Sequence, residues 1–213
     1  MTSQFMHLVR PTVAAPAATL TTGACSVKIH ASAVFQILEI VLKQALPQNK
    51  RIIGTLLGIR SDDGSEFEIR DAFMVTCTET GDLLAIDEHT HKQMYQLYKK
   101  AHPKELVLGW FGSLNTIDST TALIHDFYSK GTDRAFPYPA IYLNVDFLVP
   151  GSGNEDQERP STVKLPEITT YIGAAVKKLT SSMVDSKQGW KALNSSLSYI
   201  FTPVPNHVIE RTV

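Results

Sequence analysis

The chain has 213 residues, of which 43% are hydrophobic and 19% charged, and its formal net charge is −1 at pH 7. This composition is typical of a soluble globular protein with one well-buried domain. The near-neutral charge excludes a protein that binds nucleic acid through a large basic excess, although it leaves a local basic patch open.

Residues 1–25 are rich in Ala, Thr and Pro, and we expect them to form a flexible N-terminal arm. Pro11 and Pro16 interrupt any apolar run there, which argues against a signal peptide. No later run approaches the roughly 18 apolar residues of a membrane span. Cys25 and Cys77 belong to no C-x-x-C pair, which excludes a disulfide scaffold and favours a reducing cytosol.

The alternation in SVKIH, residues 26–30, predicts a short strand, and a helix follows from Ala31 until Pro47 ends it. An apolar stripe defines one face of this helix: Val34, Ile37, Leu38, Val41 and Leu42. Phe35 and Ile40 lie off the stripe. We therefore expect this helix to cover the core and to leave apolar side chains for a partner.

The run RIIGTLLGI, residues 51–59, predicts a central strand with both faces covered. Gly54 and Gly58 indicate places where another chain segment comes close. A second strand is expected over residues 67–77, with a bend near Asp71, and a short one over residues 83–87. A helix capped by Asp87 or Thr90 then runs to Ala101, with Met94, Leu97 and Tyr98 on one face.

The segment LVLGWFGSLNTIDSTTALIHDFYSK, residues 106–130, predicts a buried strand, a polar loop and an amphipathic helix. A turn from strand to helix is a common place for a functional site. Strands are also expected over residues 140–149, over residues 162–172 and within LSYIFTPVP. The polar residues 150–162 between them predict a surface loop or insertion.

The histidines have no spacing typical of a metal site. His89 and His91 stand two positions apart at a predicted helix start, where their side chains would point about 200° apart. We expect both to be exposed first-turn residues. The chain also has no nucleophile elbow and no glycine-rich phosphate loop.

RIIGTLLG from Arg51 and ELVLGWF from Glu105, followed by a polar loop and a helix, resemble the MPN (JAB1/MPN/Mov34) domain family. The resemblance implies a single α/β domain over residues 26–213, with a mixed, mostly antiparallel sheet flanked by helices in a three-layer, cytidine-deaminase-like arrangement. Members of this family usually continue into long C-terminal helices. We expect that helical tail to be absent here.

Metalloprotease members of the MPN family hold zinc through two His and an Asp, and a Glu activates the bound water. In this chain Arg51 stands at the Glu position, and other residues replace the rest of the motif: Gly112 and Leu114 at the His positions, Ala122 at a Ser position and His125 at the Asp position. The resemblance therefore implies a degenerate site with no metal, no cofactor and no catalytic residue. A zinc-dependent isopeptidase is the alternative that this pattern disfavours.

The finer resemblance is to the F-type subunits of eukaryotic translation initiation factor 3. It is carried by these segments: Arg51–Gly58, Met94–Leu97, Lys99–Lys100, Pro103–Leu106, Gly109–Phe111, Leu123–Ser129 and Phe201–Pro205. It implies a cytoplasmic scaffold that pairs with another, H-like MPN subunit and supports the 43S complex on the 40S ribosomal subunit. A non-catalytic MPN subunit of the proteasome lid or of the COP9 signalosome is the alternative, and direct contact with RNA stays open.

Domains of this family pair through their helices, which directs attention to apolar side chains on the two predicted helices. The candidate partner interface consists of Phe35, Leu38, Ile40, Met94, Leu97 and Tyr98.

Overall fold

The computed structural model describes residues 25–45, 51–80, 83–113, 117–131, 133–146, 167–175, 191–193 and 199–210. The predicted arm, Leu114 and the predicted loop at 150–162 lie outside these residues, so the expectations about them stay predictions. None of the described helices is long and apolar enough to cross a membrane.

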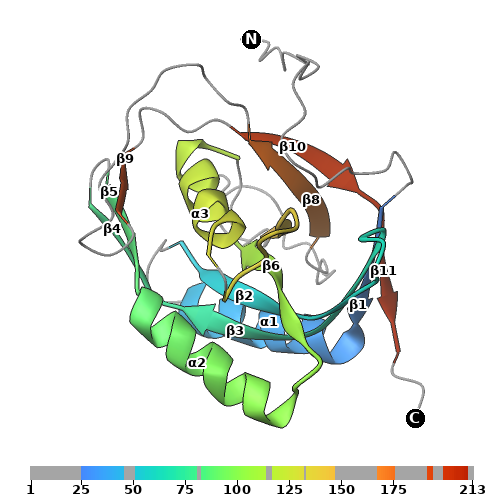
Figure 1. Ribbon diagram of the computed structural model, residues 1–213. Helices are drawn as coiled ribbons and strands as arrows, with labels where there is room; N and C mark the ends of the chain where they lie inside the picture. Colours follow the sequence, from blue (N-terminus) through green and yellow to red (C-terminus); the bar gives the residue numbers. More distant parts are fainter. Residues whose placement is uncertain are drawn as a thin grey trace, which may run out of the picture.

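Along the described chain, the helices are separated by one or more strands (Figure 1). The helices are α1 (Ala31–Ala45), α2 (Glu88–Ala101) and α3 (Ser119–Ser129). In spatial order, the strands of the large sheet are β10 (Tyr199–Val204), β8 (Glu167–Ala175), β7 (Ile141–Asp146), β6 (Leu106–Gly112), β2 (Ile53–Arg60), β3 (Glu66–Val75), β1 (Ser26–His30) and β11 (Asn206–Ile209). A smaller sheet contains β4 (Cys77–Thr80), β5 (Leu83–Ile86) and β9 (Lys191–Leu193).

The large sheet is mixed and mostly antiparallel, as expected, and it is strongly curled. Among the described strands, the parallel pairs are β1 with β3, β1 with β11 and β6 with β7. Strands β10 and β11 stand at opposite ends of the strand order, although Pro205 alone separates them in the chain. The Asn206 side chain donates hydrogen bonds to the Ile168 carbonyl at 3.2 Å and to Thr170 Oγ1 at 3.0 Å, which ties β11 to β8. The two edges of the sheet therefore approach each other.

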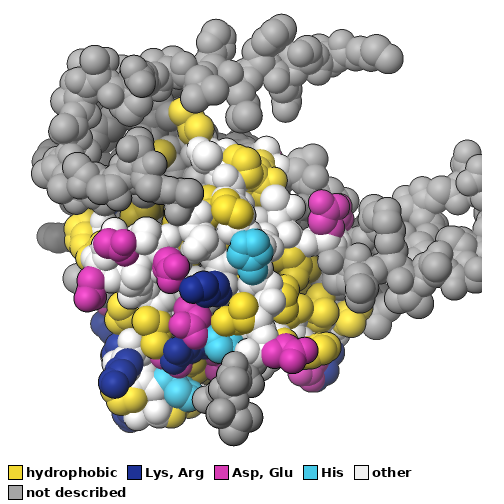
Figure 2. Space-filling view, turned by 90° about the vertical axis from the view of Figure 1, so that its right-hand side faces the viewer, with side chains coloured by type: hydrophobic (Ala, Val, Ile, Leu, Met, Phe, Trp, Pro, Cys, Tyr) yellow, Lys and Arg dark blue, Asp and Glu magenta, His cyan; other side chains and the backbone are white. Residues whose placement is uncertain are grey.

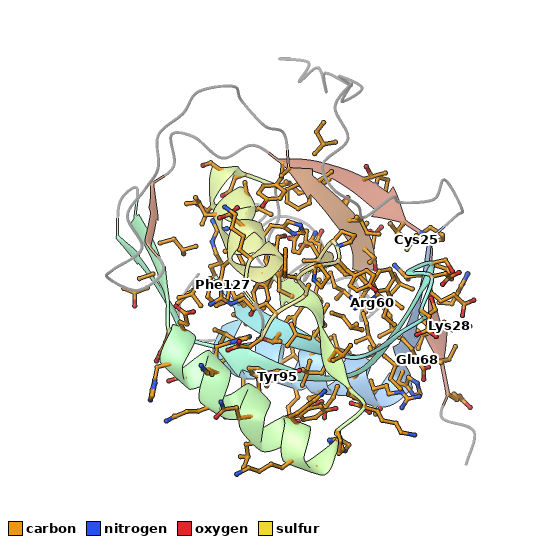
Figure 3. The ribbon with its side chains drawn as sticks, viewed as in Figure 1. Cys25, Lys28, Arg60, Glu68, Tyr95 and Phe127 are labelled. Atoms are coloured by element: carbon orange, nitrogen blue, oxygen red, sulfur yellow. The ribbon has the colours of Figure 1, made fainter. Side chains whose placement is uncertain are left out.

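Each face of the sheet carries a hydrophobic core of its own. On one face α1 contributes Ala33, Ile37 and Val41. On the other face α3 contributes Ile124, Phe127 and other residues, and partly buried tyrosines of α2 pack beside them. Figure 3 shows Phe127 on α3 and Tyr95 on α2 on this second side. The arrangement confirms a sheet flanked by helices on both faces.

Strand β2 lies at the centre of the sheet, and residues 53–58 are all buried, as the apolar run predicted. A Cβ atom on Gly54 would lie 2.1 Å from the Phe111 ring, and one on Gly58 would lie 1.9 Å from the Glu68 carbonyl oxygen. Both glycines therefore mark close approaches, as predicted. The register between β2 and β3 shifts next to Asp71, where the sequence predicted a bend.

Two expectations from the helix patterns are wrong. Leu42, predicted on the core stripe of α1, is 52% exposed, because the core face centres on Ala33, Ile37 and Val41. His91, predicted to be an exposed first-turn residue, is only 2% exposed, whereas His89 is exposed. The His91 ring packs against the rings of Phe73, Phe127 and Tyr128 at centroid distances of 5.5–5.7 Å. These are the distances of aromatic core packing.

Candidate functional site

The MPN resemblance implies a former metal position at Arg51, Gly112, Ala122 and His125, and these residues lie in or beside the start of β2, the end of β6 and α3. Ile53 pairs with Gly112 across the sheet, and the Ser113 amide donates to the Ile52 carbonyl at 3.2 Å. Gly112 in turn pairs with Asn144 at the end of β7. This is the edge at which strand-to-helix turns commonly display functional groups.

Arg51, which the resemblance assigns to the catalytic Glu position, forms an ion pair with Asp118. Its Nη2 lies 2.9 Å from Asp118 Oδ2, and its Nη1 lies 3.5 Å from Asp118 Oδ1. The Arg51 side chain is 15% exposed and that of Asp118 is 39% exposed. Because both carboxylate oxygens face the guanidinium, the pair is close to the bidentate geometry that orients Arg and carboxylate most strongly.

Asp118 also caps α3. Its Oδ1 accepts hydrogen bonds from the Thr121 amide at 2.8 Å and from Thr121 Oγ1 at 2.9 Å, while Thr121 Oγ1 accepts from the Asp118 amide at 3.1 Å. This reciprocal capping box satisfies amides that the first helical turn leaves free. Partial burial opposes ionisation, but the hydrogen bonds from Arg51 and Thr121 outweigh it and lower the pKa of Asp118. One carboxylate therefore both starts α3 and anchors it to β2.

His125, which the resemblance assigns to the Asp ligand position, is fully buried in the core. Its Nδ1 accepts a hydrogen bond from Trp110 Nε1 at 3.2 Å, and its ring packs edge-on against Tyr199 and Phe201. Burial lowers the pKa of His125 to about 4, against a smaller opposing effect of the Gly173 backbone. The imidazole is thus neutral at pH 7, and because Nδ1 accepts, its proton sits on Nε2.

Gly173 in β8 makes room for the His125 ring. A Cβ atom at this glycine would lie 2.3 Å from His125 Nε2 and 2.7 Å from two carbons of the ring. Gly173 was not among the residues that the sequence patterns predicted to matter. A glycine inside a strand is the signal that could have found it, because it often marks a close approach of other atoms.

Asp126 connects α3 to the edge of the sheet. It is 3% exposed, accepts a hydrogen bond from the Tyr199 hydroxyl at 2.8 Å and pairs with Lys130 Nζ at 2.6 Å. Burial, followed by the charge of Asp126, raises the pKa of Tyr199. The sequence did not predict this contact, because Tyr199 lies far from Asp126 in the chain.

The described residues at the former metal position do not fit a zinc ion. Gly112 and Ala122 carry no donor atom, and the imidazole of His125 is engaged by Trp110 and faces Gly173. The guanidinium of Arg51 adds a positive charge, which opposes a second cation. No group of three or more His, Cys, Asp or Glu residues in the described ranges is placed to hold a metal ion. A zinc site needs about three protein ligands.

The candidate interface residues differ in how much they expose. Phe35 is 71% exposed, Leu97 64% and Met94 41%, so these three offer apolar surface on α1 and α2. Leu38 and Ile40 are partly buried against the α1 core. Tyr98 packs against the core on the other face of the sheet from α1, and its hydroxyl donates a hydrogen bond to Glu105 Oε2. Figure 2 shows hydrophobic side chains spread over the face that it presents, with one group at the right, and basic side chains from its centre to its lower left.

The Arg51–Asp118 pair is expected to contribute to stability. In a double-mutant cycle with Arg51→Ala and Asp118→Asn, we expect a coupling free energy of about 1 kcal/mol, because the pair is partly shielded and bidentate. The Asn keeps an oxygen for the cap. Denaturant unfolding of the four proteins measures the coupling. The matched control is a double-mutant cycle on the more exposed Lys28–Glu66 pair, for which we expect a coupling free energy below about 0.5 kcal/mol. Equal coupling free energies in the two cycles would contradict a stabilising role specific to the Arg51–Asp118 pair.

The two buried histidines are expected to make stability depend on pH. Burial, with a further contribution from the charge of Arg134, lowers the pKa of His91 to about 4 in the folded state, and that of His125 also lies at about 4. Because the unfolded chain binds these protons near pH 6.5, stability falls as the pH drops from about 6.5 to about 4, by up to about 1.4 kcal/mol per pH unit for each histidine.

Urea unfolding at several pH values measures this slope. His91→Leu should remove the share of His91, whereas His89→Leu, on the exposed side of the same helix, should leave the slope unchanged. A stability that stays constant between pH 6.5 and pH 4 would rule out neutral buried histidines.

Comparison with known proteins gives the family. The family model described as "JAB1/Mov34/MPN/PAD-1 ubiquitin protease" matches residues 22–134. Curated relatives are named as the F subunit of eukaryotic translation initiation factor 3. The relative from Phaeosphaeria nodorum is 36% identical over 96% of this chain and 52% of its own length. The relative from Aspergillus oryzae is 44% identical over 82% of this chain and 49% of its own length. The F subunit of Aspergillus terreus is 44% identical over 96% of this chain and 52% of its own length.

The chain spans about half the length of these curated relatives. A Desulfitobacterium hafniense protein solved in solution has a TM-score of 0.48 and 12% identity, covering 87% of this chain and 94% of its own. The resemblance to the F-type subunits extends over most of the chain, as predicted. The family model covers more than half of the chain, and the chain belongs to the JAB1/Mov34/MPN/PAD-1 family.

Proposed function

We propose that this chain is the MPN domain of a subunit of eukaryotic translation initiation factor 3 and that it acts there as a non-catalytic scaffold. The observation that carries the proposal is its 36–44% identity to curated F-type subunits over 82–96% of its length. On this proposal the protein works in the cytoplasm, supporting the 43S complex on the 40S ribosomal subunit through its partner subunits.

The geometry of the former metal position supports the non-catalytic part of the proposal. Zinc-dependent hydrolysis in this family needs a metal-bound water and a carboxylate base beside it. Arg51 stands in place of the base, and its guanidinium is bound to the Asp118 carboxylate. The one imidazole that remains, His125, belongs to the core. These residues supply neither the metal site nor the base.

The exposed apolar side chains of α1 and α2 support pairing with another MPN subunit, and an H-like subunit is our candidate. Phe35 on α1 and the pair Met94 and Leu97 on α2 give each helix an apolar strip beside its core face. Apolar surface of this kind, with charged side chains around it, is typical of protein interfaces. Because α1 and α2 lie on opposite faces of the sheet, these residues are proposed as two contact surfaces: Phe35 with Leu38 and Ile40 on α1, and Met94 and Leu97 with Tyr98 on α2.

Two alternatives belong to the same family. A non-catalytic subunit of the proteasome lid or of the COP9 signalosome would share the fold, but the curated relatives reported above are initiation factor subunits. A zinc-dependent isopeptidase would need ligands that Gly112, Ala122 and the buried His125 do not provide.

Affinity purification of the tagged full chain from its own cells, followed by mass spectrometry, tests the proposal. We expect initiation factor 3 subunits and 40S proteins to co-purify. The double variant Met94→Glu/Leu97→Glu should lose the MPN partner, because it places two charges in an apolar contact. The double variant Gln93→Glu/Gln96→Glu adds the same charge at exposed polar positions of α2 and should keep the partner.

Recovery of lid or signalosome subunits in place of ribosomal proteins would reject the initiation factor. If both double variants kept the partner while the wild type bound initiation factor subunits, the α2 interface alone would be wrong.

A further inference from the structure

Almost every described lysine and arginine side chain has a specific partner. The partners are Glu66 for Lys28, Glu39 for Lys43, Asp118 for Arg51, the Tyr138 ring for Arg60, Glu68 for Arg70, Asp133 for Lys92, the Glu105 carbonyl for Lys99, Asp126 for Lys130 and Glu88 for Arg134. Within the described part of the chain, Lys100 and Lys104 form no ion pair or hydrogen bond. These two cations lie in the same short segment, at the end of α2.

His102 stands between them and is held in a fixed place. It caps α2, its backbone N–H donates to the Tyr98 carbonyl at 2.9 Å, and its exposed ring lies against the Tyr98 ring at a centroid distance of 4.5 Å. Tyr98 itself is fixed by its hydroxyl bond to Glu105. In the sequence, an anchored and exposed aromatic residue therefore lies between two exposed lysines that form no ion pair or hydrogen bond.

Acidic groups near this segment are engaged in other contacts. The chain has no Asp or Glu between Glu88 and Glu105. Glu105 is 7% exposed and contacts Tyr98 and Arg70, and Asp71 faces the Tyr98 hydroxyl as well. Lysines near a helix C-terminus also stabilise the helix dipole. Lys99 already donates a hydrogen bond at this end of the helix, to the Glu105 carbonyl, and Lys104 lies beyond the last helical turn.

We propose that Lys100, His102 and Lys104 form a contact for single-stranded RNA. The two ammonium groups bind successive phosphates of the backbone, and an unstacked base lies on the exposed face of His102. RNA offers this alternation of phosphate and planar base, and proteins bind single strands through cations combined with aromatic platforms. An acidic peptide would engage the lysines but would have no group for the ring. The contact goes beyond the proposed scaffold role, which needs no direct RNA binding.

Fluorescence anisotropy with the full chain and a labelled single-stranded oligouridine tests the contact. We expect weak, salt-dependent binding. Lys100→Gln/Lys104→Gln should weaken it at least about tenfold and reduce the slope of log K against log salt by about 1.4, that is, about 0.7 for each of two phosphates. Lys28→Gln/Lys43→Gln removes the same charge from paired lysines and should leave the affinity within about twofold, apart from a general charge effect.

The histidine separates RNA from a generic anion. His102→Ala should lower the affinity for the oligouridine about fivefold or more, because it removes the stacking surface, whereas His89→Ala should not. Circular dichroism verifies that each variant is folded. The proposal is overturned if the wild type does not bind, if both lysine double variants weaken binding equally, or if polyglutamate binds as tightly as the RNA. Each of these results leaves the co-purification with initiation factor subunits unaffected.

Discussion

The burial of α3 is the constraint on which the rest of the structure depends. Residues 120–128 are all buried, so this helix has no solvent face on which to place polar groups. Buried polar groups are costly unless they are hydrogen-bonded. Three acidic or histidine side chains along it form such contacts: Asp118 binds Arg51 and caps the helix, His125 accepts from Trp110, and Asp126 binds Tyr199 and Lys130. Among the described residues, the other ring nitrogen of His125, Nε2, is buried without a hydrogen-bond partner. At the C-terminal end of α3, the Arg134 side chain donates hydrogen bonds to the carbonyls of Phe127 and Lys130.

These contacts also join the strand ends to α3 through side chains of the protein itself. In a metalloprotease of this family, zinc would link the strand ends to the start of the helix. Here the Arg51–Asp118 ion pair links β2 to α3, and His125, packed against Gly173, links α3 to β8. The positive charge at this position is the guanidinium of Arg51, which is part of the protein chain and is not a bound ion.

The sequence predicted what depends on local patterns. The buried run at 53–58, the two glycines that face Phe111 and Glu68, the cap at Asp87 and the strand-to-helix turn after Gly112 all have local signals, and the structure confirms them. Contacts between distant segments had no such signal. The parallel pairing of β11 with β1 and the Tyr199–Asp126 bond depend on how the sheet curls. His91 was predicted to be exposed because it stands in the first turn of a helix, yet aromatic neighbours surround it here.

We propose that this domain holds α3 by the Arg51–Asp118 ion pair, at the position where the MPN resemblance implies a zinc ion in metalloprotease members. The metal content of the purified full chain, measured by mass spectrometry after dialysis against zinc and then against metal-free buffer, tests this most directly. The account predicts much less than one zinc per chain, and no gain in the variant Arg51→Ala, because Gly112 and Ala122 offer no ligand. One tightly held zinc per chain would contradict it.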